Sequence, residues 1–90
     1  MLGVGTLKYT SIVNGDWNNY KGCQIISSNT TSVFDWADAH RPTSNDATLM
    51  VLGDTVRILQ FHIDQSLGTW VRSKGDRNES FTAWSKILTP

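Results

Sequence analysis

The sequence predicts a small all-β protein: an antiparallel β-meander or sandwich of about four to six strands, preceded by an extended stem segment. Thr, Ser, Val, Ile and Trp are frequent in the chain, whereas the helix formers Ala and Glu are scarce. Several short runs alternate apolar and polar side chains, which indicates half-buried strands. Turn-like segments separate the last runs, and consecutive hairpin connections produce an antiparallel meander.

The first twenty residues differ from the rest of the chain. Glycine and asparagine interrupt any period, and the apolar side chains follow neither a strand nor a helix pattern. Such a segment frays when it stands alone. We therefore expect residues 1–20 to be a stem that becomes ordered against partner chains, and residues 21–90 to form the β domain.

The β domain begins with a predicted strand at residues 22–27, in which alternate side chains face opposite sides. A polar region follows it. Its first part, residues 32–39, starts with a serine that could cap one or two helical turns. Its second part, residues 41–46, is a loop, since Pro42 is incompatible with a regular helix or a central strand.

Residues 47–52 and 55–64 form the next predicted hairpin. The pair Gly53-Asp54 lies between them and suits a tight type II′ turn, because this turn takes glycine at its first central position.

The strand at residues 55–64 changes character along its length. Its first half is apolar on both faces. In its second half Gln60 and His62 alternate with Phe61 and Ile63, which indicates one wet face. This pattern is typical of a strand that runs from the core toward an edge.

Two further strands, at residues 69–73 and 81–88, complete the meander after loops at residues 65–68 and 74–80. Tryptophans in both strands are expected in the core, because their large rings are rarely left in water.

One arginine is placed beside an aromatic side chain in this last hairpin. Arg72 alternates in step with Trp70, so both side chains leave the same face of the strand. We expect Arg72 to make an internal salt bridge or cation–π contact that fixes the hairpin.

Size and composition predict self-association. A chain of 90 residues has room for only a marginal core. Its one cysteine cannot form an internal disulfide, and His40 and His62 stand apart from any zinc-ligand cluster. We expect no metal and no cofactor, and oligomerisation is the remaining way to bury more apolar surface.

Charge and hydropathy argue against two classes of partner. Eight basic and eight acidic residues give a formal net charge of zero without a basic stripe, whereas nucleic-acid binding requires clustered Lys and Arg. No apolar run approaches the ~20 residues of a membrane-spanning helix. We expect neither nucleic-acid binding nor membrane insertion.

Short motifs, taken in order along the chain, resemble those of one protein family. They are Leu2-Gly3-Val4-Gly5-Thr6, Asp16-Trp17-Asn18, Ala39-His40-Arg41-Pro42, Gln60, Trp70-Val71-Arg72 and Phe81-Thr82-Ala83-Trp84. Their order is similar to that of the knob module at the distal end of pyocin and bacteriophage tail fibres. Two positions depart from the family pattern: Trp17 stands where the family usually has Leu, and Phe81 where it has the first Trp of a closing Trp-x-x-Trp.

The resemblance implies a homotrimeric, non-enzymatic module at the tip of a tail fibre of the virion, made in the cytoplasm of the bacterial host. It implies that residue 1 lies within a longer fibre, so the rest of that fibre is also a partner. The receptor would be a bacterial surface glycan, such as lipopolysaccharide or capsule, or a surface protein. We expect the stem to supply the trimer interface through its apolar side chains: Leu2, Val4, Leu7, Ile12 and Trp17.

The expected receptor contacts lie in the polar region, where an aromatic ring is surrounded by polar residues. Loops on a rigid scaffold carry specificity, and a tryptophan ring is a platform for a sugar. The candidates are Trp36, Asp38, His40, Arg41 and Asn45. Burial of Trp36 beneath the loop is the competing interpretation.

Two other functions remain open. The chain could be a purely structural cap that trimerises the fibre, or a fragment of a polysaccharide depolymerase. Glycoside hydrolysis requires a carboxylate pair beside an apolar cleft, and a short meander has little depth for one. We therefore do not expect an enzyme.

Overall fold

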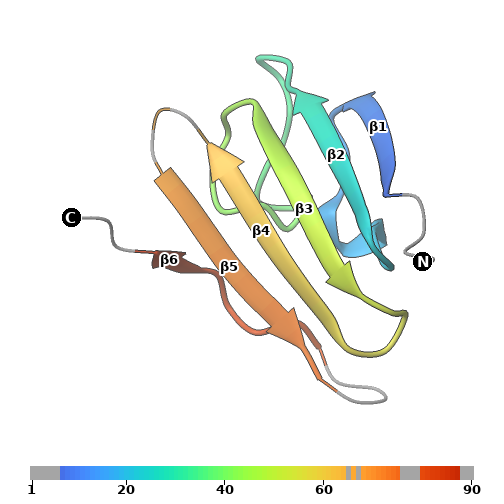
Figure 1. The fold of residues 1–90 in the computed structure, drawn as a ribbon. Helices are drawn as coiled ribbons and strands as arrows, with labels where there is room; N and C mark the ends of the chain where they lie inside the picture. The colour runs from blue at the N-terminus through green and yellow to red at the C-terminus, as the bar shows by residue number, and fades with distance from the viewer. Residues whose placement is uncertain (1–6, 65, 67, 76–79, 88–90) are drawn as a thin grey trace.

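A computed structural model describes residues 7–64, 66, 68–75 and 80–87 and shows an all-β fold built on one six-stranded sheet (Figure 1). The strands lie in chain order across the sheet: β1 (Lys8–Val13), β2 (Gln24–Asn29), β3 (Ala47–Gly53), β4 (Ile58–Asp64), β5 (Gly68–Lys74) and β6 (Ser85–Ile87). Within these ranges the helical structure is the short 3-10 turn η1 (Trp17–Asn19). No helix in the described part of the chain is long and apolar enough to cross a membrane.

The sheet is mixed, which differs from the purely antiparallel sheet predicted. Strands β2 to β6 form the expected antiparallel meander, but β1 runs parallel to β2, with Lys8 opposite Gln24 and Val13 opposite Asn29. Part of the segment predicted as a stem is therefore a strand of the sheet. Strand β1 was not predicted because its side chains show no clear alternation of apolar and polar residues. Its place in the sheet comes from backbone hydrogen bonds to β2, which do not depend on the side chains of β1.

The turn between β3 and β4 is longer than the two-residue turn predicted. Gly53 has φ +111°, and a Cβ there would clash with the carbonyl oxygen of Arg57. The Asp54 carboxylate accepts hydrogen bonds from the backbone N–H groups of Val56 (2.7 Å) and Arg57 (2.8 Å), and these bonds lower the pKa of Asp54. The aspartate thereby holds a four-residue loop, and β4 begins at Ile58 rather than at residue 55.

Two other segments are less regular than predicted. The strand expected at residues 81–88 is limited to β6, and Phe81 and Trp84 precede it as irregular chain packed against the core. The helical turn considered for residues 32–39 is a single turn, in which Ala39 N–H bonds the carbonyl of Asp35 at 3.2 Å.

The hydrophobic core lies on one face of the sheet, which we call the covered face. Its fully buried residues are Trp17, Ile26, Leu49, Val51 and Ile58. The β1–β2 connection and the long β2–β3 loop lie behind the sheet in Figure 1 and supply this cover. The N–H of Trp17 donates to the carbonyl of Ala39 at 2.9 Å and joins the two segments. The fold is therefore one sheet backed by loops.

Candidate binding surfaces

The covered face is built around polar side chains that are wholly buried. The Gln60 amide nitrogen donates to the carbonyl oxygens of Trp17 (2.8 Å) and Tyr20 (3.0 Å). Its amide oxygen accepts a bond from the Arg72 Nε at 2.8 Å. Gln60, which is 0% exposed, thus fastens the β1–β2 connection to the middle of the sheet. The wet face predicted here is wrong, because the loops satisfy its polar groups.

A second buried chain of hydrogen bonds passes through His62. Trp17 Nε1 donates to His62 Nδ1 at 2.9 Å, so the neutral ring carries its proton on Nε2 and donates it to Thr43 Oγ1 at 3.1 Å. The Thr43 hydroxyl then donates to Asp64 Oδ2 at 2.7 Å. Burial lowers the pKa of His62 to about 4, against the opposing effect of Asp64. Both ring nitrogens are therefore occupied by internal partners.

Two arginines are buried between aromatic rings. Arg41 Cζ lies 3.7 Å from the ring centroid of Trp17 and 4.7 Å from that of Phe34. Arg72 Cζ lies 3.8 Å from Phe81 and 4.5 Å from Trp84, which confirms the expected cation–π contact. Burial lowers the pKa of each guanidinium to about 10, so both remain charged at neutral pH.

The predicted receptor residues divide into two groups. Trp36, Asp38 and His40 are exposed and lie in one turn of the β2–β3 loop, and His40 Nδ1 is 3.0 Å from an Asp16 carboxylate oxygen. Arg41 instead lies within the core, where it is 3% exposed and bonds Gly15 and Ser28.

The fifth predicted receptor residue lies elsewhere. Asn45 is half-buried, and its amide nitrogen is 3.4 Å from Asp64 Oδ1. This places Asn45 at the ends of the strands, so the structure groups only three of the five candidates in one turn of the loop.

The three predicted trimer residues that the structure describes do not share one surface. Leu2 and Val4 lie outside the described residues. Leu7 is half exposed, whereas Ile12 packs against the core of its own chain. Trp17 is fully buried in that core, so its side chain offers no area to a second copy.

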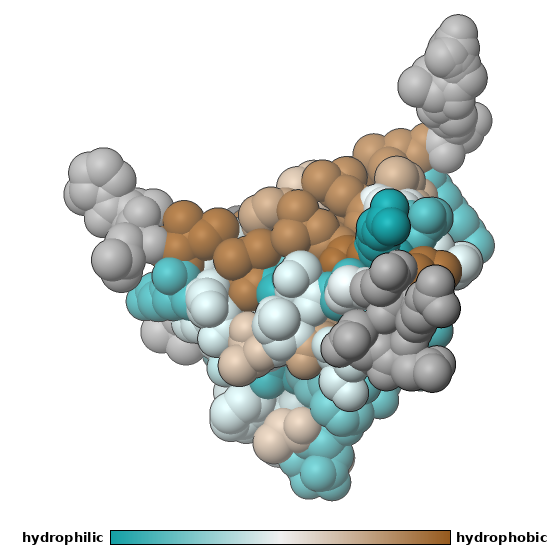
Figure 2. All heavy atoms as spheres, turned by 90° about the horizontal axis from the view of Figure 1, so that it is seen from below, coloured by the Kyte–Doolittle hydropathy of each residue, from teal (hydrophilic) through white to brown (hydrophobic). Residues whose placement is uncertain are grey.

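The other face of the sheet is apolar and is not covered by any described segment of the chain, and we call it the open face. Figure 2 shows apolar residues gathered along one side of the molecule and a mostly polar surface opposite. The pairing register places one apolar row across five strands: Tyr9, Ile25, Met50, Phe61 and Val71. Beside this row, Leu52 is 39% and Ile63 is 40% exposed. Among the described strand residues, none that alternates onto this face is charged.

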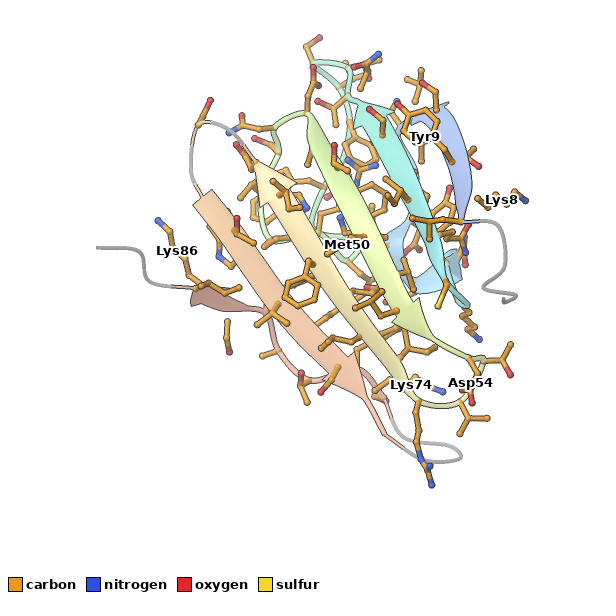
Figure 3. All side chains as sticks on the ribbon, viewed as in Figure 1. Lys8, Tyr9, Met50, Asp54, Lys74 and Lys86 are labelled. Carbon is orange, nitrogen blue, oxygen red and sulfur yellow. The ribbon has the colours of Figure 1, made fainter. Side chains whose placement is uncertain are left out.

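Three lysines lie at the periphery of the sheet. Figure 3 shows Lys8, Lys74 and Lys86 at its edges and end, away from the central Met50. By register they belong to the alternation of the covered face, and Lys86 Nζ lies 5.3 Å from the ring centroid of Trp70.

The open face was not predicted from the sequence. Met50, Phe61 and Val71 each lie in one of three central predicted strands, at a position that alternates with core-facing positions of the same strand.

A polar pocket of about 390 Å³ lies at the ends of β2, β3 and β4. Its lining includes Ser27, Asn29, Asp46, Ile63, Asp64 and Ser66, and we call it the strand-end pocket. Because Val13 pairs with Asn29 while Lys8 pairs with Gln24, the pocket lies at the opposite end of the sheet from the start of β1.

Comparison with known proteins gives no relative: no family model, curated protein or solved structure matches the chain. The interpretation of these surfaces therefore depends on their own chemistry.

Proposed function

We propose that this chain is a non-enzymatic module at the tip of a tail fibre, which assembles as a homotrimer and attaches to the surface of a bacterium. The order of motifs described above supports the fibre assignment. The observation that carries the proposal is the open face, because a sheet with one uncovered apolar side is complete only when another chain covers it.

The composition of the open face favours a copy of the same chain as its occupant. Its strand residues carry no charge that a second copy would repel or leave unpaired. The chain as a whole is neutral, with eight basic and eight acidic residues, so three copies bring no net repulsion together. A row that includes Tyr9, Met50 and Phe61 also contains the side-chain types enriched at the centres of interfaces.

Trimeric assembly would explain how weak contacts give firm attachment. Each copy presents the exposed turn with Trp36, Asp38 and His40, and the strand-end pocket. A contact with a surface saccharide is weak at one site, but three sites on one tip raise the effective concentration of each for the others.

The first experiment measures the molar mass of the full chain by light scattering over a range of concentrations. We expect three times the chain mass of 10.1 kDa and a monomer for the Met50→Ser, Phe61→Ser double variant. Val33→Ser is the matched control, since Val33 is an 89% exposed apolar residue outside the sheet. A monomeric unmodified chain would contradict the proposal.

The second experiment measures adsorption of labelled trimer to candidate host cells. Adsorption supports attachment, whereas stable trimers that adsorb to none of the tested cells favour the purely structural cap. Incubation with purified capsule or lipopolysaccharide, followed by sizing of the polysaccharide, tests the depolymerase alternative. Shortened chains would overturn the non-enzymatic assignment.

A further inference from the structure

We infer that the strand-end pocket is a binding site for a neutral saccharide. This inference rests on the proposed attachment function and names the site and ligand class for it. The pocket volume of about 390 Å³ falls within the roughly 300–1,000 Å³ of small-ligand sites.

Asp46 is positioned to accept a hydrogen bond from a ligand. Its Oδ1 accepts bonds from the backbone N–H (2.8 Å) and the hydroxyl (3.1 Å) of Thr30. These bonds fix the carboxylate, and its Oδ2 has no hydrogen-bond partner within the described part of the chain. An ionised carboxylate accepts only, so the ligand group facing Oδ2 must be a donor, such as a sugar hydroxyl.

Asp64 forms a rigid wall of the pocket. It accepts hydrogen bonds from the hydroxyl of Thr43 (2.7 Å) and the backbone N–H of Ser66 (2.8 Å). Because Thr43 is also bonded to His62, the wall is anchored in the buried core. A pre-ordered wall reduces the entropy lost when a ligand binds.

The remaining polar lining is suited to hydroxyl groups. The exposed Asn29 side chain carries both a donor and an acceptor, and Ser27 and Ser66 add hydroxyls that act as either. Ile63 precedes the last residue of β4, where the open face meets the pocket. It is 40% exposed, and its pocket side gives an apolar patch for the C–H groups of a sugar ring. Alternating hydroxyl and C–H groups are the surface that a pyranose presents.

The charge of the pocket selects against acidic ligands. Asp46 and Asp64 both line it, and no Lys or Arg side chain is part of the lining. A phosphate, uronic acid or sialic acid would approach two carboxylates. Arg41, a cation that interacts electrostatically with Asp46, is buried in the core and is not part of the lining. Within the described residues no group of three or more His, Cys, Asp or Glu could hold a metal, so a metal-bridged anion is also disfavoured.

The experiment presents the intact protein to an array of neutral hexose oligosaccharides and their uronic acid and phosphorylated counterparts. We expect binding to neutral members and none to acidic counterparts. Titration calorimetry with the best neutral oligosaccharide then compares Asp46→Asn and Asn29→Ala with the unmodified chain. Asp46→Asn keeps an oxygen for Thr30, so the loop is retained while the charged acceptor is lost, and we expect at least a tenfold weaker affinity.

Asp54→Asn is the matched control, because Asp54 is an exposed carboxylate in the β3–β4 loop outside the pocket, and its Oδ1 also accepts backbone N–H bonds that an asparagine oxygen can keep. It should change affinity less than twofold. Binding of acidic rather than neutral glycans, no binding to any neutral member, or greater weakening by Asp54→Asn than by Asp46→Asn would overturn the inference. Molar mass and cell adsorption are measured on the same samples. If the Asp46→Asn variant forms trimers that adsorb as well as the unmodified protein, only the assignment of the pocket is contradicted. If the unmodified protein is a monomer that does not adsorb, the proposed function is contradicted.

Discussion

The two faces of the sheet reverse the usual relation between polarity and burial. On the covered face Gln60, His62 and Arg72 are 5% exposed or less although all are polar. On the open face Tyr9 is 66% and Ile63 40% exposed although both carry large apolar groups. The amide of Gln60 and the ring nitrogens of His62 have internal hydrogen-bond partners. Arg72 Nη2 has no hydrogen-bond partner among the described residues, and the Arg72 guanidinium lies against two aromatic rings. The apolar side chains of the open face remain exposed because the described loops that pack on the sheet lie on its other side.

The comparison also separates two sources of stability. The covered face is completed within one chain by the loops that carry Trp17 and Arg41. In the proposed assembly, the open face gains apolar burial, at about 25 cal/mol per Å², from a second copy. Variants on the covered face should therefore change folding at any concentration, and variants on the open face should change assembly.

The largest effect is expected for Trp17→Ala. Trp17 is fully buried, donates to His62 and stacks on Arg41. Its loss should lower the free energy of unfolding by about 5 kcal/mol, measured by urea denaturation. Trp36→Ala, at a 39% exposed tryptophan, should cost less than ~1 kcal/mol. Equal losses for the two variants would contradict the distinction between the core and the exposed loop.

The next effect is a pH dependence that is specific to the covered face. Burial lowers the pKa of His62 from 6.5 to about 4, so the unfolded chain binds a proton between these values that the folded chain does not. Stability from this residue is full above pH 6.5 and declines by about 3 kcal/mol as the pH falls to 4. Urea denaturation at several pH values should show this decline, and His62→Gln should remove it. If the free energy of unfolding of His62→Gln decreases with falling pH as steeply as that of the unmodified protein, other groups cause the pH dependence.

A smaller loss is expected when the stacked guanidinium is replaced. Arg72→Lys keeps the positive charge but removes the planar group between Phe81 and Trp84 and the bond to Gln60. We expect about 2 kcal/mol lower stability in thermal or urea unfolding. Arg57→Lys, at an exposed arginine in the β3–β4 loop, provides the control. If both variants lose the same amount of stability, the stacking of Arg72 on Phe81 and Trp84 contributes little.

The smallest change in the folding of one chain is expected on the open face. Phe61→Ser should shift the midpoint of thermal unfolding only slightly at low protein concentration. The unmodified protein should unfold at a higher temperature as its concentration rises, because assembly adds stability by mass action. The variant should lose that dependence. A midpoint of the unmodified protein that is constant over a hundredfold range of concentration would show that the open face does not associate.

The strands that alternate or form apolar runs were predictable from the sequence. The strands near residues 22–27, 47–52 and 69–73 were each found within about two residues of the structure. Strand β1 was not, because Lys8–Val13 gains its place from hydrogen bonds to β2 and not from an alternating pattern.

The sites were less predictable, since they depend on contacts between distant residues. Arg41 resembled a surface ligand contact because it lies in a polar loop region near Trp36, yet Trp17 and Phe34 enclose it. The presence of a polar residue in the sequence does not show whether its side chain forms hydrogen bonds with protein or with water. The strand-end pocket joins Asn29, Asp46 and Asp64 from three strand ends, a grouping that only the register provides.

The placement of β1 and β6 at opposite edges of the sheet has a mechanical consequence. The register aligns Lys8 with Arg72, and Ile87 pairs with Thr69, only three positions away along β5. Five inter-strand spacings of about 4.8 Å separate the two edge strands, against about 3.3 Å per residue along a strand. Tension between residues 8 and 87 is therefore directed mainly across the strands, so it opens the inter-strand hydrogen bonds one after another. A single domain pulled at these two points should yield at low force.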